Sequence, residues 1–234
     1  MPTALKLLDA EVTACRLCPR LVEYRERIGR EKRRAYRDCE YWARPVPGFG
    51  DPAARVLVFG LAPGAHGSNR TGRPFTGDRS GDFMYPILHR LGFASQPLAT
   101  GRDDGMKLHD MWITAAVRCA PPDNKPLLSE LAACSPFTDR EFAALKHLKV
   151  VVALGKYAFD AYLDSLNRHA ATQGRPLLRR ADYKFAHLAE FALPSGVTLL
   201  ASYHPSNQNT ATGKLTVPMF EKVFVRARDL AEGI

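Results

Sequence analysis

The chain has 234 residues, of which 46% are hydrophobic, and this suits one globular domain with room for a core. No apolar run is long enough for a membrane helix, and the first twelve residues lack the features of a signal peptide, so we expect a cytoplasmic protein that does not bind membranes. The formal net charge is +9, and Arg outnumbers Lys among the 33 basic residues, which favours a polyanionic partner.

The apolar pattern predicts helices and strands that alternate along a single domain, residues 1–234. Short runs rich in β-branched residues indicate four buried strands, at 55–59, 111–117, 150–154 and 197–202. Helices are expected at 3–14, 20–42, 82–91, 136–148, from 156 onward and at 217–231, with an irregular segment at 165–190. This order predicts an α/β fold, a three-layer α/β/α arrangement with a central four-stranded parallel sheet.

Three of the predicted strands end in polar, Pro-containing loops, at 60–81, 118–126 and 203–214. The carboxyl ends of parallel strands lie at one edge of a sheet, so these loops are expected to converge on one cleft. The first loop carries charge, an aromatic residue and several glycines, with little of the Lys and Glu usual in an incidental surface loop. It matches neither the Walker nor the dinucleotide-binding fingerprint. We therefore expect a site of another kind.

Several residues near these loops have two interpretations. His204 follows the last strand, and from its position a structural and a functional role are equally supported. Phe75 can pack within its own loop or stack on a nucleobase. The arginines of 20–42 are interspersed with Glu23, Glu26 and Glu31, so a solvated helix face explains them at least as well as a nucleic-acid face.

The chain has five cysteines, which in a reducing compartment favour metal binding or catalysis over disulfides. Cys15 and Cys18 form a C-x-x-C pair, Cys119 and Cys134 stand singly, and Cys39 is left over. Four thiolates can hold a zinc ion or a [4Fe–4S] cluster. A zinc ribbon has two C-x-x-C pairs, so the single pair favours iron–sulfur mildly. Buried free thiols remain the alternative for Cys39 and Cys134.

Four short motifs occur in order along the chain: GLAPG at 60–64, GRPFTGD at 72–78, PPDNK at 121–125 and HPS at 204–206. Together with the four cysteines they resemble the iron–sulfur uracil-DNA glycosylases, and family 5 of that superfamily in particular, over about residues 15–216. The resemblance implies a monofunctional base-excision repair enzyme that hydrolyses the N-glycosidic bond of uracil in DNA and leaves an abasic site. It also implies a fold with a four-stranded parallel sheet and a [4Fe–4S] cluster on Cys15, Cys18, Cys119 and Cys134.

The chain departs from the better-known family 4 at three positions. Leu61 stands where that family has an acidic residue, and Ala115 where it has an asparagine that reads the uracil edge. Ala62 lies near the superfamily's catalytic carboxylate position and cannot act on water. Family 5 shares these losses, and the resemblance implies a broader substrate range that includes other deaminated bases such as hypoxanthine.

The resemblance also suggests roles for individual residues. His204 is expected to donate a hydrogen bond to the developing anion on the base, while Asp78, helped by Asn124, positions water and stabilises the cationic sugar. Phe75 is expected to stack on the base after its extrusion from the duplex. The other residues expected to line the pocket are Gly60, Leu61, Ala62, Pro63, Gly64 and His66. The expected DNA contacts are Arg70, Arg73, Ser206, Asn207 and Lys214, and the enzyme is expected to act on DNA as a monomer.

Two other functions are compatible with parts of the sequence. A non-catalytic iron–sulfur protein that binds nucleic acid would explain the charge and the cysteines, but not three converging polar loops. A zinc-stabilised hydrolase of nucleotides would use the same cysteines with a different metal. A zinc deaminase is disfavoured, because the chain has no H-x-E motif followed by P-C-x-x-C.

Overall fold

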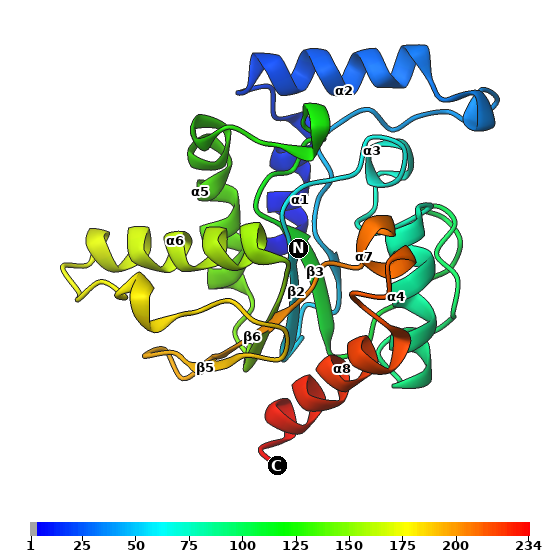
Figure 1. The fold of residues 1–234 in the computed structure, drawn as a ribbon. Helices are drawn as coiled ribbons and strands as arrows, with labels where there is room; N and C mark the ends of the chain where they lie inside the picture. Colours follow the sequence, from blue (N-terminus) through cyan, green and yellow to red (C-terminus); the bar gives the residue numbers. More distant parts are fainter. Residues whose placement is uncertain (1–3) are drawn as a thin grey trace.

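The computed structural model describes residues 4–234, and six strands within them form one sheet in the order β1-β3-β2-β4-β6-β5 (Figure 1). The four central strands run parallel: β2 (Val56–Gly60), β3 (Met111–Ala115), β4 (Val150–Leu154) and β6 (Thr198–Ser202). The edge strands β1 (Phe49–Gly50) and β5 (Glu190–Ala192) pair antiparallel with β3 and β6. The predicted four-stranded parallel sheet is therefore the centre of a six-stranded mixed sheet.

Helices cover both faces of the sheet, as Figure 1 shows, with α4 (Arg79–Arg90) and α8 (Val217–Glu232) on one face. The other face carries α5 (Leu128–Ala144) and α6 (Lys156–Thr172), and α1 (Ala4–Ala14) packs against α5. Alternate residues of a strand face opposite sides of a sheet. Accordingly, Val56 and Val58 pack with α4 and α8, whereas Leu57 and Phe59 pack with α6. The three-layer α/β/α arrangement follows directly from strands that are apolar on both faces.

Two helices differ from the prediction by more than three residues at one end or both. The predicted helix 20–42 is shorter, because α2 (Pro19–Glu31) stops before Lys32, whose φ of 52° is left-handed. The predicted helix 136–148 begins earlier, at Leu128, so that Pro136 lies inside α5. Pro136 has no N–H to donate to the carbonyl of Ala132, but the Ser135 hydroxyl donates to that carbonyl instead, at 2.9 Å.

The remaining short elements are α3 (Ser68–Thr71), α7 (Asn207–Ala211), η1 (Arg34–Tyr36), η2 (Pro122–Asn124) and η3 (Arg180–Asp182). The predicted irregular segment 165–190 begins with the end of α6, which continues to Thr172. No helix among residues 4–234 combines the length and apolarity needed to cross a membrane.

The connections after β2 and β4 leave the sheet in opposite directions. These strands are parallel neighbours, yet β2 leads to α4 on one face and β4 leads to α6 on the other. Such a reversal opens a crevice at the carboxyl ends of the strands, where ligands bind in open α/β sheets. The site is therefore expected beyond Gly60 and Leu154.

Candidate active site

A cleft of about 930 Å³ opens at the carboxyl ends of the parallel strands. This volume lies within the range of pockets that enclose a small molecule. The loops after β2, β3 and β6 meet there as predicted, and the start of α6 after β4 supplies a further wall. The predicted site residues that line the cleft are Gly60, Leu61, Ala62, Pro63, Gly64, His66, Phe75, Asp78, Asn124, His204, Ser206 and Asn207.

Asp78 caps the N-terminus of α4 from within the cleft. Its Oδ1 accepts a hydrogen bond from the backbone N–H of Gly81 at 3.0 Å. Burial raises the pKa of Asp78 above its ordinary value of 3.8, although the backbone hydrogen bonds of Gly81 and Ser80 counteract part of this effect. The carboxylate is thus held in a fixed position, in surroundings where its negative charge is poorly solvated and therefore acts strongly on a nearby cation.

Gly67 leaves the space that the Asp78 carboxylate occupies. A Cβ atom on Gly67 would stand 1.9 Å from Asp78 Oδ2, which no side chain can tolerate without moving. We expect Gly67→Ala to displace the carboxylate and to lower the single-turnover rate of the uracil removal that the sequence predicts by about 10²-fold, the effect of misplacing a catalytic group by about 1 Å. Gly101→Ala is the control, since its Cβ would meet no atom within 4 Å and Gly101 does not line the cleft. Equal rates for the two variants would contradict the prediction.

His204 and Phe75 lie together in the cleft. Their ring centroids are 5.9 Å apart, and the Phe75 ring also approaches Gly60, where an added Cβ would stand 3.3 Å from Phe75 Cζ. Burial lowers the pKa of His204 to about 4, so the imidazole is neutral at pH 7. Among residues 4–234 no hydrogen bond engages its ring nitrogens; only its backbone carbonyl accepts one, from Asn209. A neutral imidazole N–H is therefore available to a ligand.

The lowered pKa of His204 predicts a specific loss of stability in acid. In the unfolded chain this histidine has its ordinary pKa of 6.5, so it binds a proton below about that pH. In the folded chain it binds a proton only below about pH 4. The free energy of unfolding should therefore fall as the pH drops from 6.5 towards 4. Urea unfolding at pH 7 and pH 5 tests this, because His204→Gln cannot titrate and should lose less stability than the unmodified protein. An equal decrease in the free energy of unfolding of both proteins would contradict a lowered pKa at His204.

Asn124 and His66 occupy the rim and one wall of the cleft. Asn124 ends η2 in a left-handed conformation with φ 56°, and it is exposed. His66 Nδ1 and Tyr41 Oη form a hydrogen bond at 3.0 Å. Burial lowers the pKa of His66, and the charges of Arg33 and Arg70 lower it further. Both residues line the cleft.

The predicted DNA contacts Arg70 and Arg73 have protein partners instead. Arg73 is 3% exposed and forms an ion pair with Asp104 at 2.6 Å. Arg70 donates hydrogen bonds to the carbonyls of His66 and Gly77 at 2.9 and 2.7 Å. Neither side chain lines the cleft, so the geometry gives them a role in bracing the loop, and we do not retain them as phosphate contacts.

Ser206, Asn207 and Lys214 follow β6 and remain near the surface. Ser206 caps α7 by accepting a hydrogen bond from the Asn209 N–H at 3.3 Å, and Arg79 donates to Asn207 Oδ1 at the mouth of the cleft. Lys214 Nζ lies 5.0 Å from the centre of the Tyr203 ring. Ser206 and Asn207 line the cleft, whereas Lys214 does not.

Four of the five cysteines line one small cavity below α2. Cys15 follows α1 and Cys18 caps α2, while Cys119 follows β3 and Cys134 lies in α5. Burial raises the thiol pKa of Cys119 to about 12 and that of Cys134 to about 11. No three His, Cys, Asp or Glu side chains in the described part of the chain are arranged to hold one metal ion.

A buried arginine points at this cavity. Arg25 is 2% exposed, and its Nη1 lies 2.9 Å from Cys119 Sγ. Its Nη2 donates to the backbone carbonyl of Cys15 at 3.2 Å, while its Nε is buried without a hydrogen-bond partner in the described residues. A buried cation with an unpaired donor is costly unless an anion lies opposite it. Glu26 Oε1 lies 3.9 Å from Nη2, and thiolates in the cavity would place further negative charge beside Arg25.

A family model described as "Uracil DNA glycosylase superfamily" matches residues 47–228, from just before β1 into α8. Over 220 residues the chain is 54% identical to a type-5 uracil-DNA glycosylase of Thermus thermophilus, which covers 94% of this chain and 95% of the relative. The chain belongs to the type-5 uracil-DNA glycosylases. A type-5 enzyme of Mycobacterium bovis is 46% identical over 96% of this chain and 81% of its own length. A type-4 enzyme of Sulfurisphaera tokodaii reaches only 26% over 82% of this chain and 79% of its own length.

The three positions that are predicted to differ from family 4 line the cleft. Leu61, Ala62 and Ala115 are among its lining residues. They follow or end the neighbouring strands β2 and β3, which pair in register at Gly60 and Ala115. At these three positions the side chains that line the cleft are apolar.

Three segments of this type-5 chain line the cleft without having been predicted. They are Arg33, Ala35 and Tyr36 after α2, Val46 and Pro47 before β1, and Lys156 and Tyr157 at the start of α6. The third has a signal in the sequence, since Gly155 and Lys156 follow a buried strand as the three polar loops do. The first follows a helix and has no such signal, because only the folding of α2 across the molecule brings it to the cleft.

Proposed function

We propose that this chain hydrolyses the N-glycosidic bond of uracil in DNA and leaves an abasic site, as the first step of base-excision repair. The observation that carries the proposal is the placement of Asp78, Phe75 and His204 in one cleft whose volume can enclose a nucleobase. Cleavage of the bond develops positive charge on the sugar and negative charge on the base. The cleft offers a carboxylate for the first and a neutral N–H donor for the second.

At the sugar end, the negative charge of Asp78 stabilises the cationic sugar. Water adds to C1′ and transfers its proton to the carboxylate, while the base leaves with the electron pair of the broken bond. Burial strengthens the attraction between the carboxylate and the cationic sugar, because the surrounding protein screens the charge less than bulk water does. Asn124, at the rim of the cleft, orients the water through its side-chain amide.

At the base end, His204 donates a hydrogen bond to the oxygen on which negative charge develops. The pKa of about 4 keeps the imidazole neutral at pH 7, so it acts as a donor without first binding a proton. Phe75 beside it stacks on the base once the base has left the duplex. Ser206, Asn207 and Lys214 contact the DNA strand near the mouth of the cleft.

The apolar side chains of Leu61, Ala62 and Ala115 support a broad substrate range. A site that hydrogen-bonds a substrate edge rejects analogues strongly, whereas an apolar pocket discriminates only weakly. These residues supply no such hydrogen bond, so we propose that hypoxanthine and other deaminated bases are also removed.

Oligonucleotides that carry uracil or hypoxanthine test both parts of the proposal. Cleavage of the product by alkali reveals abasic sites, and we expect it for both bases. A protein that binds these oligonucleotides without producing abasic sites would be the non-catalytic iron–sulfur binder instead.

We also propose that Cys15, Cys18, Cys119 and Cys134 hold a [4Fe–4S] cluster. Four thiols with no other metal-binding side chain suit iron–sulfur chemistry, in which each thiolate binds a different iron and the sulfurs need not converge on one ion. Arg25 faces the same cavity and supplies a positive charge opposite the anionic cluster. The cluster would join α1, α2, α5 and the end of β3. A colourless protein that contains zinc would contradict this assignment.

A further inference from the structure

The basic segment around α2 divides into two parts with different surroundings. In the first part, each cationic side chain has a partner: Arg16 pairs with Glu26, Arg20 with Glu130 and Arg27 with Glu31, while Arg25 contacts Cys119. The second part contains Arg30, Arg33, Arg34 and Arg37, which we call the basic rim. These four are exposed, and within residues 4–234 no hydrogen bond or ion pair engages their guanidinium groups. The first part is therefore a helix face on which the charges are paired. The second part leaves its positive charges free for an anionic partner.

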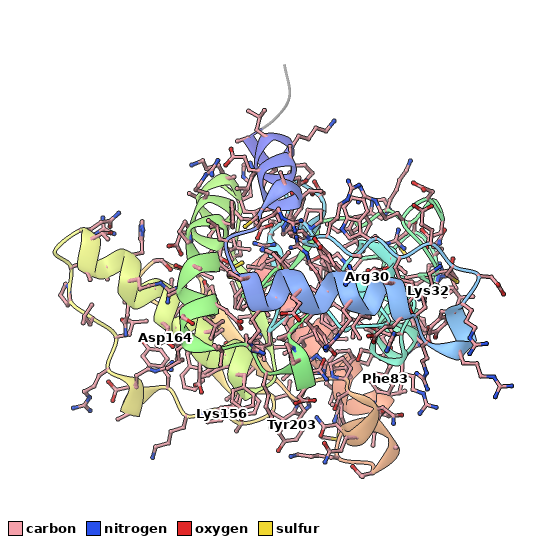
Figure 2. All side chains as sticks on the ribbon, turned by 90° about the horizontal axis from the view of Figure 1, so that it is seen from above. Arg30, Lys32, Phe83, Lys156, Asp164 and Tyr203 are labelled. Atoms are coloured by element: carbon pink, nitrogen blue, oxygen red, sulfur yellow. The ribbon has the colours of Figure 1, made fainter. Side chains whose placement is uncertain are left out.

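The basic rim reaches the cleft at Arg33. Arg33 and Tyr36 line the cleft, and the charge of Arg33 is close enough to lower the pKa of His66 on the cleft wall. Figure 2 looks down on the molecule and shows α2 crossing it, with Arg30 and Lys32 at its end and with Lys156 and Tyr203 to one side. Unpaired positive charge thus borders the opening through which a base would enter.

The position of the rim is fixed relative to the catalytic loop. The Arg70 guanidinium stacks on the Tyr36 ring at 4.1 Å and donates hydrogen bonds to the loop carbonyls of His66 and Gly77. Further along the chain, the backbone N–H of Trp42 donates a hydrogen bond to the backbone carbonyl of Arg70 at 2.8 Å. The backbone segment that carries these arginines is thus held at a constant distance from Phe75 and Asp78, so the rim can meet a bound polymer in one register.

We propose that the basic rim binds the sugar–phosphate backbone of duplex DNA beside the extruded nucleotide. This inference rests on the proposed function. Duplex DNA carries one negative charge per about 1.7 Å of its axis, and arginine is suited to bidentate contact with phosphate. Contacts of this kind carry no sequence information and position the duplex over the cleft. Arg70 does not contact the DNA in this arrangement; it positions the basic rim by stacking on the Tyr36 ring.

The test compares two double variants that remove the same net charge. Arg34→Gln/Arg37→Gln changes two rim arginines that do not line the cleft, whereas Arg168→Gln/Arg175→Gln changes exposed arginines at and just beyond the far end of α6, with Arg168 roughly 18 Å along the helix from its start at the cleft. Fluorescence anisotropy on an undamaged duplex gives Kd at several salt concentrations. Each lost phosphate contact lowers the slope of log Kd against log salt by about 0.9. We expect a decrease of about 1.8 for the rim variant and no change for the control.

Single-turnover excision at saturating enzyme separates this inference from the proposed function. The rim variant should excise uracil at the rate of the unmodified protein once the DNA is fully bound. Equal salt slopes for the two double variants would overturn the assignment of the rim, even if excision is normal. Loss of excision at saturation in a folded rim variant would also overturn it, since the arginines would then act in the reaction. A failure of the unmodified protein to excise uracil would overturn the proposed function alone, because binding to undamaged duplex still reports on the rim.

Discussion

Replacing Asp78 with asparagine is expected to lower the single-turnover rate of uracil excision by about 10²- to 10³-fold, the usual effect of removing one group that stabilises transition-state charge. Asparagine is as good a helix cap as aspartate, so its side-chain oxygen can still accept the hydrogen bond from the Gly81 N–H. The fold and the affinity for DNA should therefore be retained. Only the negative charge opposite the sugar is lost.

Asp82→Asn is the matched control for this experiment. Asp82 lies in the first turn of the same helix, is exposed and does not line the cleft. Its replacement removes the same charge from α4 and should leave excision unchanged. If Asp78→Asn excises uracil as fast as Asp82→Asn, the water is positioned by another group, and Asn124 becomes the first candidate.

Replacing Cys119 with serine is expected to abolish the visible absorbance of the purified protein and to lower its free energy of unfolding by about 4 kcal/mol or more, as loss of a structural metal site does. The side chain is buried, and Arg25 would face the cavity without a thiolate. Absorbance, iron content and urea unfolding together measure the effect.

Cys39→Ser is the control for the cysteine experiment. Cys39 lies outside the cavity that the other four cysteines line, and it is only partly buried. Its replacement should change neither the absorbance nor the stability. A Cys119→Ser protein that keeps its colour and its stability would exclude Cys119 as a ligand.

The central sheet could be predicted because its strands carry their own signal. Val150 to Leu154 is apolar throughout, and it is buried on both faces as such a run predicts. The edge strands carry no such signal. Phe49 and Gly50 form a strand through backbone pairing with Trp112 and Ile113, and Glu190 to Ala192 is half exposed. Strands of this kind depend on a neighbour that the local sequence does not reveal.

In the candidate site, too, some features could be predicted from the local sequence and others depend on tertiary contacts. Asp78, Phe75 and His204 could be proposed from their motifs and their places after strands, and the structure brings them to one cleft. The partners of Arg70 and Arg73 could not be predicted. An arginine in a polar loop has the same local sequence whether it meets a phosphate or, as Arg73 does, a carboxylate about thirty residues away. Tertiary contacts decide which cations remain free for DNA.

The cysteine cavity has a further consequence for the unfolded chain. Its four thiols come from two segments about a hundred residues apart, one before α2 and one after β3. A cluster bound to all four would act as a cross-link that closes this loop, and closing a loop of that length restricts the unfolded chain by about 4.7 kcal/mol in the chain-entropy model. The segment that contains α2 and the basic rim would then stay tethered to the sheet through Cys15 and Cys18 when its other contacts break.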